Sequence, residues 1–200
     1  MNFELFLAIF VKFVFLLTPF FAINMFISLT QGCDRDRQRA IAIKVTLVTL
    51  GLCTLLFFLG KPMLVMFGLD LNGFRMGAGV LLMLTAIALA QGPVEAPKSM
   101  DAEDVAVVPL AIPTILGPAT ISTILVYGTE QDTAGKKCTA FAALISALLC
   151  VGVLLWFANF IERLVGPRVL RILSKLTGII LAAIAAQMIM AGYKNLMNGP

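Results

Sequence analysis

Long apolar stretches separated by short polar loops run through the whole chain and predict six membrane spans. Each stretch is close to or longer than the roughly 20 residues that cross a bilayer as a helix. The polar segments between the stretches are too short to form a separate soluble domain. We therefore expect membrane helices at about residues 3–30, 40–60, 74–91, 105–129, 138–160 and 173–193.

Two features of the fourth stretch, residues 105–129, conflict with a continuous helix. It contains Pro109 and Pro113, and then the pair Gly117-Pro118. Proline removes a backbone donor, and broken backbone in hydrocarbon needs cover from protein or a watery cavity. A half-helix that begins at a proline directs free N–H groups toward an anionic ligand. The alternative is a proline kink that only packs against neighbouring helices.

A second break occurs in the first span, and this repetition favours a functional break over a kink that only packs. Thr18-Pro19 precedes Gly117-Pro118 by 99 positions, and the third and sixth spans match at an offset of 100. Each half then holds three spans, an odd number, so the second half must insert with inverted topology. The sequence predicts an all-α membrane protein of six helices in two inverted three-helix repeats, with the first and fourth helices broken. Within one integral membrane domain, the repeats are residues 1–97 and 98–200.

Inverted repeats with interrupted helices are typical of secondary transporters, which bind substrate near the bilayer midplane where the repeats meet. We expect backbone N–H groups near the two breaks to bind an anionic group, with hydroxyl and amide side chains beside them. For Asn24 an interhelical hydrogen bond is the alternative. The predicted substrate-binding residues are Thr18, Pro19, Asn24, Pro113, Gly117, Pro118, Thr120 and Ser122.

Charged residues are rare inside the predicted spans. Lys12 and Arg75 are candidate charge partners for a substrate, although each could instead anchor its helix at the interface. All eleven Asp and Glu residues fall in predicted loops or in the first few residues. No midplane carboxylate is therefore expected to carry a coupling proton. Sodium held by carbonyl and hydroxyl oxygens and uncoupled diffusion both stay open.

Composition agrees with the membrane assignment and narrows the function classes. The chain is 60% hydrophobic and 13% charged, whereas soluble domains carry about 25% charged residues. It has no histidine and no closely spaced cysteine pair, so we expect neither an enzyme nor a metal or other cofactor site. The net charge of +4 is spread over short loops and predicts topology, with no nucleic-acid partner.

The distribution of Lys and Arg predicts the orientation of the chain. The loops after the first, third and fifth spans and their flanks hold nine of these residues, and the opposite side holds five. The positive-inside rule then places the first set in the cytoplasm and both termini outside it.

Two segments of this chain carry a specific pattern, FGLDLNGFRMGAGVLLMLTAIAL (67–89) and DVAVVPLAIPTILGPATIS (104–122). They resemble the MarC family of bacterial and archaeal inner-membrane proteins, and the resemblance covers essentially the whole chain. The first break usually reads Asp/Asn-Pro-x-Gly in that family, with a further proline, whereas this chain has Thr18-Pro19-Phe20-Phe21 and Asn24. The resemblance implies an inner-membrane carrier of neutral amino acids, without the carboxylate at its first half-site.

We therefore expect a secondary transporter of small polar solutes, with neutral amino acids as substrates, that works by alternating access. Its partners would be a small-molecule substrate, the lipid bilayer and, given the small size of the chain, further copies of itself. A channel-like metabolite exporter and a membrane scaffold without transport activity are the two rival hypotheses.

Overall fold

The computed structural model describes residues 3–30, 32–91, 116–129 and 133–197, and all regular secondary structure in these ranges is α-helical. The class predicted from the sequence, an all-α membrane protein, is confirmed. The helices are α1 (Phe3–Leu16), α2 (Pro19–Leu29), α3 (Arg35–Met66), α4 (Leu71–Gln91), α5 (Pro118–Thr129), α6 (Ala134–Trp156), α7 (Ala158–Val165) and α8 (Pro167–Met197).

Five segments in the described part of the chain are long and apolar enough to cross a bilayer, with α1 and α2 together forming one of them. The predicted fourth span is represented only by residues 116–129, which include α5. The remainder of that span, with Pro113, lies outside the described residues. The structure thus supports a multi-pass membrane protein.

Several helices end at positions different from those predicted. The predicted second and sixth spans, 40–60 and 173–193, are the central parts of α3 and α8, which continue past the apolar window at both ends. Hydropathy marks the part of a helix that lipid covers, and a helix can continue into polar surroundings. The fifth span was predicted to reach residue 160, but α6 ends at Trp156 and the short helix α7 follows.

The α4–α8 pair is the most extensive helix contact among the described helices, and glycines let the two backbones approach closely. A Cβ on Gly178 would lie only 2.8 Å from the Ala86 carbonyl oxygen, and one on Gly79 would lie 3.1 Å from the Ala185 carbonyl oxygen. Residue numbers rise along α4 as they fall along the facing part of α8, so the two helices are antiparallel. Close approach through small residues is the usual way in which membrane helices associate.

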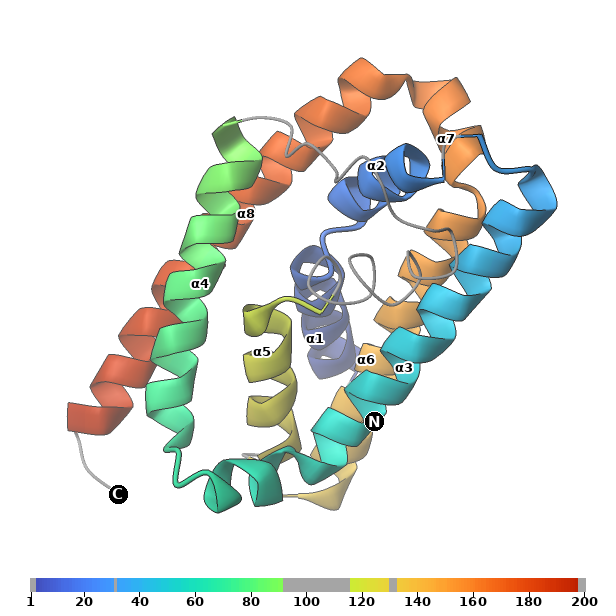
Figure 1. Cartoon of the computed structure of the whole chain (residues 1–200). Coiled ribbons are helices and arrows are strands. Elements are labelled where there is room, and N and C mark those ends of the chain that lie inside the picture. The colour runs from blue at the N-terminus through green and yellow to red at the C-terminus, as the bar shows by residue number, and fades with distance from the viewer. Residues whose placement is uncertain (1–2, 31, 92–115, 130–132, 198–200) are drawn as a thin grey trace.

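The broken helices occupy the middle of the molecule. Figure 1 shows α1, α2 and α5 between the α4–α8 pair on one side and the α3–α6 pair on the other. Contacts from α1 to α6, from α2 to α8, and from α5 to both α3 and α4 hold them there. Phe13, Leu17, Ile23 and Ile124 are almost completely buried in this centre. The fold therefore places both helix breaks in the interior.

Candidate functional site

The first helix break lies between Leu16, the last residue of α1, and Pro19, the first residue of α2. Thr18 joins them in the left-handed conformation, with φ 46° and ψ 58°. Among the described residues it is the only non-glycine with a positive φ. An L-residue pays roughly 1–2 kcal/mol for this conformation. Backbone strain of this kind gathers at functional sites, where surrounding structure must hold it in place.

The break leaves backbone donors available at the start of α2. The first hydrogen bond of this helix runs from the Ala22 N–H to the Thr18 carbonyl oxygen, 2.9 Å. The N–H groups of Phe20 and Phe21 therefore have no acceptor within their own helix. The Thr18 side chain does not cap them either. Pro19 lacks an N–H and suits the first helical position, as the sequence predicted.

The second break has the same construction. Pro118 is the first residue of α5, and the first helical bond runs from the Ile121 N–H to the Gly117 carbonyl oxygen, 3.1 Å. The N–H groups of Ala119 and Thr120 consequently have no acceptor within the helix. Both half-helices thus begin at the prolines predicted from the sequence.

The structure brings the two breaks into direct contact. The Thr120 hydroxyl donates a hydrogen bond of 3.3 Å to the Leu16 carbonyl oxygen, across 104 positions of the chain. The interruption at Thr18 exposes this carbonyl at the end of α1. Thr120 at the second break therefore provides a hydrogen-bond donor for the Leu16 carbonyl oxygen at the first break. The contact was not predictable from spacing, because it depends on how the two halves pack.

Two hydroxyls at the breaks are buried without any hydrogen-bond partner. They are Thr18 Oγ1 and Ser122 Oγ, and no other buried side-chain nitrogen or oxygen in the described ranges lacks a partner. Thr18 is 5% exposed and Ser122 is completely buried. A buried polar group left unsatisfied costs about 1–3 kcal/mol. A polar ligand at the breaks would recover this cost, which makes these two residues the strongest candidates for binding.

Asn24 has a partner already. Its side-chain amide donates a hydrogen bond of 3.1 Å to the Ser174 hydroxyl, which links α2 to α8. The Ser174 hydroxyl in turn donates to the Leu170 carbonyl oxygen. This is the interhelical bond considered above as the alternative to ligand binding, and we assign Asn24 to helix packing.

Substitutions at Asn24 and Ser174 provide a test of that assignment. We expect Asn24→Leu and Ser174→Ala to show a coupling free energy of about 0.6 kcal/mol, the average for interhelical hydrogen bonds in a membrane. The measurement is a double-mutant cycle on unfolding in detergent micelles. Zero coupling, together with loss of ligand binding in Asn24→Leu alone, would instead return Asn24 to the binding site.

The two predicted charge partners lie inside the bundle. The Lys12 ammonium is 5.7 Å from the centre of the Tyr127 ring on α5, a cation–π distance. Arg75 on α4 is buried, and Lys12 on α1 is partly buried. A cation in the membrane region favours an anionic group nearby. Tyr127 was not singled out in the sequence, because only the packing of α1 on α5 places it at Lys12.

The part of the chain that the structure describes contains no cluster of three or more His, Cys, Asp or Glu side chains that could hold a metal ion. Its four cysteines are free thiols. The groups that the structure shows at the breaks are backbone N–H groups and the hydroxyls of Thr18, Thr120 and Ser122. Such groups can hydrogen-bond small polar or anionic molecules.

Comparison with known proteins gives the same family for the whole chain. The model for the MarC family integral membrane proteins matches residues 3–197. A UPF0056 membrane protein of Methanocaldococcus jannaschii is 30% identical, with 97% of this chain and 98% of the relative covered. Others from Aquifex aeolicus (28%; 97% and 94% covered) and Escherichia coli, there called YhcE (26%; 99% and 96% covered), are similar over comparable lengths. No solved structure gives a significant match. The chain therefore belongs to the MarC family of integral membrane proteins.

Proposed function

We propose that this protein is a secondary transporter of small polar solutes, with neutral amino acids as its substrates, that binds them where the two helix breaks meet. The observation that carries the proposal is the pair of buried, unpartnered hydroxyls of Thr18 and Ser122 beside two half-helix N-termini. Each N-terminus offers free N–H groups and the positive end of a helix dipole.

The chemistry of a neutral amino acid fits these groups. Its carboxylate can accept hydrogen bonds from the N–H groups at the start of α2 or α5, as anions do at helix N-termini. The hydroxyls of Thr18 and Ser122 can each donate to or accept from the ligand's polar atoms. Lys12 on α1, six positions before Thr18, adds positive potential within the same bundle, which favours the approach of a carboxylate.

Reciprocal packing of α4 and α8 supports the inverted repeats that alternating access needs. Gly178 follows Gly79 by 99 positions and Ala185 follows Ala86 by 99, and each glycine faces the alanine of the other repeat. This offset is one less than the 100 expected from the sequence for these two spans, and it equals the offset of 99 between the two helix breaks. A twofold axis between antiparallel helices inverts one repeat relative to the other. Rocking of residues 1–97 against 98–200 would then expose the central site to each side in turn.

We place the protein in the bacterial inner membrane with both termini outside the cytoplasm, as the loop charges predict. Coupling through a carboxylate at the first break is not available, since Thr18 stands there. Sodium bound by carbonyl and hydroxyl oxygens, or facilitated diffusion without an ion, are the two modes compatible with these residues.

The test is ligand-dependent unfolding of the purified protein, followed by flux in proteoliposomes. A neutral amino acid at a hundredfold excess over its Kd should stabilise the folded state by about 2.7 kcal/mol. Uptake should saturate and should be accelerated by unlabelled substrate on the opposite side. Repeating both measurements with and without sodium distinguishes the two coupling modes.

Two outcomes would contradict the proposal. Flux that neither saturates nor shows counterflow would identify a channel-like exporter. Absence of both stabilisation and flux with every amino acid would instead favour a membrane scaffold.

A further inference from the structure

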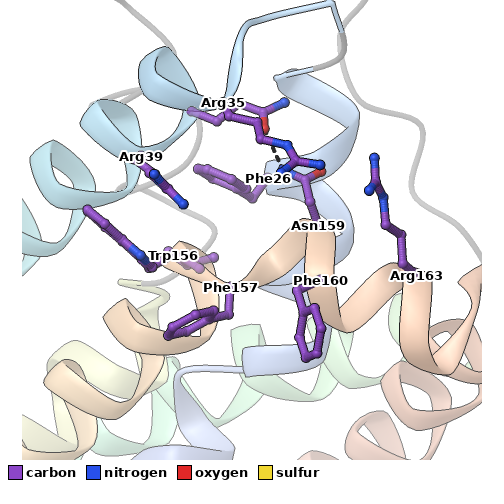
Figure 2. Close-up of a pocket in the computed structure, with 10 residues that line it drawn as sticks. Phe26, Arg35, Arg39, Trp156, Phe157, Asn159, Phe160 and Arg163 are labelled. Carbon is purple, nitrogen blue, oxygen red and sulfur yellow. Dashed lines mark hydrogen bonds between the residues drawn. The ribbon is translucent and has the colours of Figure 1, made fainter.

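A polar cavity of about 190 Å³ lies at one end of the bundle, where α2, α3, α6 and α7 meet. Figure 2 shows it with Arg35 and Arg39 contributed by α3, and Arg163 contributed by α7. Phe26 of α2 also lines it. These residues are distinct from those at the helix breaks, so the cavity calls for a separate explanation.

The arginines bring an excess of positive charge to the cavity. The only ion pair found among the described residues joins Arg39 to Asp36 at 3.8 Å, with the Asp36 side chain almost fully exposed to solvent. Such an exposed pair adds little stability. The Arg39 guanidinium also lies 5.4 Å from the centre of the Trp156 ring. Arg35, Arg39 and Arg163 are exposed to solvent, and an anion placed among them would be attracted to all three guanidinium groups.

The amides in the cavity are already hydrogen-bonded and make its wall rigid. The Asn159 amide donates to the Gln38 side-chain oxygen, and the Gln38 amide donates to the Thr30 carbonyl oxygen at 3.0 Å. These bonds hold α7, α3 and the end of α2 together. The guanidinium groups thus remain as the main donors for a ligand, and their planar fork suits a phosphate oxygen pair.

An apolar groove of about 430 Å³ lies beside this cavity, between α3 and α6. The two share Trp156 and Phe157. Leu47 at the far part of the groove is eight positions after Arg39, about 12 Å along the helix. The Thr46 hydroxyl in the groove donates to the Ala42 carbonyl oxygen, so its proton is used within α3. The groove therefore runs from the charged end of the bundle along the apolar part of α3.

We propose that this cavity and groove together bind one anionic phospholipid, with its phosphate among Arg35, Arg39 and Arg163 and an acyl chain along α3 and α6. A free phosphate ester would fit the cavity alone, but the neighbouring apolar groove, which shares Trp156 and Phe157 with it, favours a lipid. Basic pockets between membrane helices at the cytoplasmic side suit anionic headgroups, and tryptophan is frequent at headgroup level. The inference does not depend on transport.

The experiment compares lipids and variants on the full-length protein in neutral detergent. Phosphatidylglycerol should raise the unfolding temperature and stay bound in native mass spectrometry, whereas phosphatidylcholine with the same chains should not. Arg35→Gln and Arg163→Gln should each weaken phosphatidylglycerol binding roughly fivefold, the contribution of one cation at an anionic surface. Arg168→Gln is the matched control, because Arg168 is exposed on α8 and does not line the cavity.

Two further arms separate a lipid from a free phosphate ester. Val153→Trp should fill part of the groove and weaken the binding of the long-chain lipid. Soluble glycerol phosphate should bind much more weakly than the lipid to the wild-type protein. Any of three results would overturn the proposal. The protein could bind phosphatidylglycerol and phosphatidylcholine equally, or Arg168→Gln could weaken lipid binding as much as Arg163→Gln. The third is equal affinity for glycerol phosphate and for the lipid.

Discussion

Replacing Gly178 with alanine is expected to destabilise the protein by about 1–3 kcal/mol, the usual cost of forcing extra volume into a packed interior. The added Cβ would lie 2.8 Å from the Ala86 carbonyl oxygen and 3.0 Å from the Ala90 nitrogen. Both are backbone atoms, so only separation of α4 from α8 can relieve the clash. Leucine at this position should cost more and should prevent the pair from forming. Thermal unfolding in detergent, followed by circular dichroism, measures both variants.

Gly77→Ala is the matched control for this prediction. Gly77 lies on α4 two residues before the packed Gly79, but a Cβ there would meet nothing within 4 Å. Alanine is also a better helix former than glycine by up to about 1 kcal/mol, so this variant should be neutral or slightly more stable. Equal losses in Gly77→Ala and Gly178→Ala would show that the packing of α4 on α8 is not the cause.

The reciprocal geometry extends the prediction to Gly79→Ala, whose Cβ would meet Ile189 Cγ1 at 2.8 Å and the Ala185 carbonyl oxygen at 3.1 Å. A single change already pushes the helices apart, so the double variant with Gly178→Ala should cost less than the sum of the two. Additive losses would mean that the two contacts yield independently. A loss of stability smaller than the sum would show that the two glycines belong to one packed interface between α4 and α8.

The helix breaks could be predicted from the sequence because their causes are local. Proline fixes its own φ and lacks a donor, so Pro19 and Pro118 begin half-helices wherever their neighbours lie. The ends of the long helices were less predictable, as α3 continues beyond the apolar window on both sides. The break at Phe157 carries neither proline nor glycine, and the apolar pattern runs across it without a signal.

The details of the site depend on contacts between distant parts of the chain. The bond from Thr120 to Leu16 and the bond from Asn24 to Ser174 each join residues more than 100 positions apart. A β-branched residue such as Thr18 is also a rare choice for a positive φ. The surroundings of Thr18 must impose that conformation. In the sequence, Arg35, Arg39 and Arg163 indicated only the topology of the chain. The cavity that they line was not predictable, because only the turn from α6 into α7 brings Arg163 toward Arg39.

Ser122→Ala and Thr18→Val are expected to separate binding from stability. Each removes a buried oxygen without a hydrogen-bond partner, so the free energy of unfolding should stay the same or rise by about 1 kcal/mol. A hydrogen bond to a charged ligand group is worth about 1.5–3 kcal/mol, so each variant should bind its amino acid at least tenfold more weakly. Ligand-dependent thermal shifts measure both quantities in the same sample.

Two further variants control for shape and for hydroxyl loss in general. Thr49→Val removes a buried hydroxyl that is already bonded to the Val45 carbonyl oxygen on α3, so binding should not change. Thr18→Asn keeps a polar side chain and eases the left-handed backbone, which asparagine tolerates well. It should be more stable than the wild type and should retain more binding than Thr18→Val.

Only a binding role makes binding and stability respond differently to the same substitution. Removing a hydroxyl that holds the helices together would weaken both ligand binding and stability, and the two losses would scale with each other. A buried hydroxyl without a partner lowers stability, and a hydrogen bond to a bound ligand offsets that cost. If Ser122→Ala and Thr18→Val each lose ligand binding and stability together, these residues serve in packing. That result would remove the main support for a carrier site.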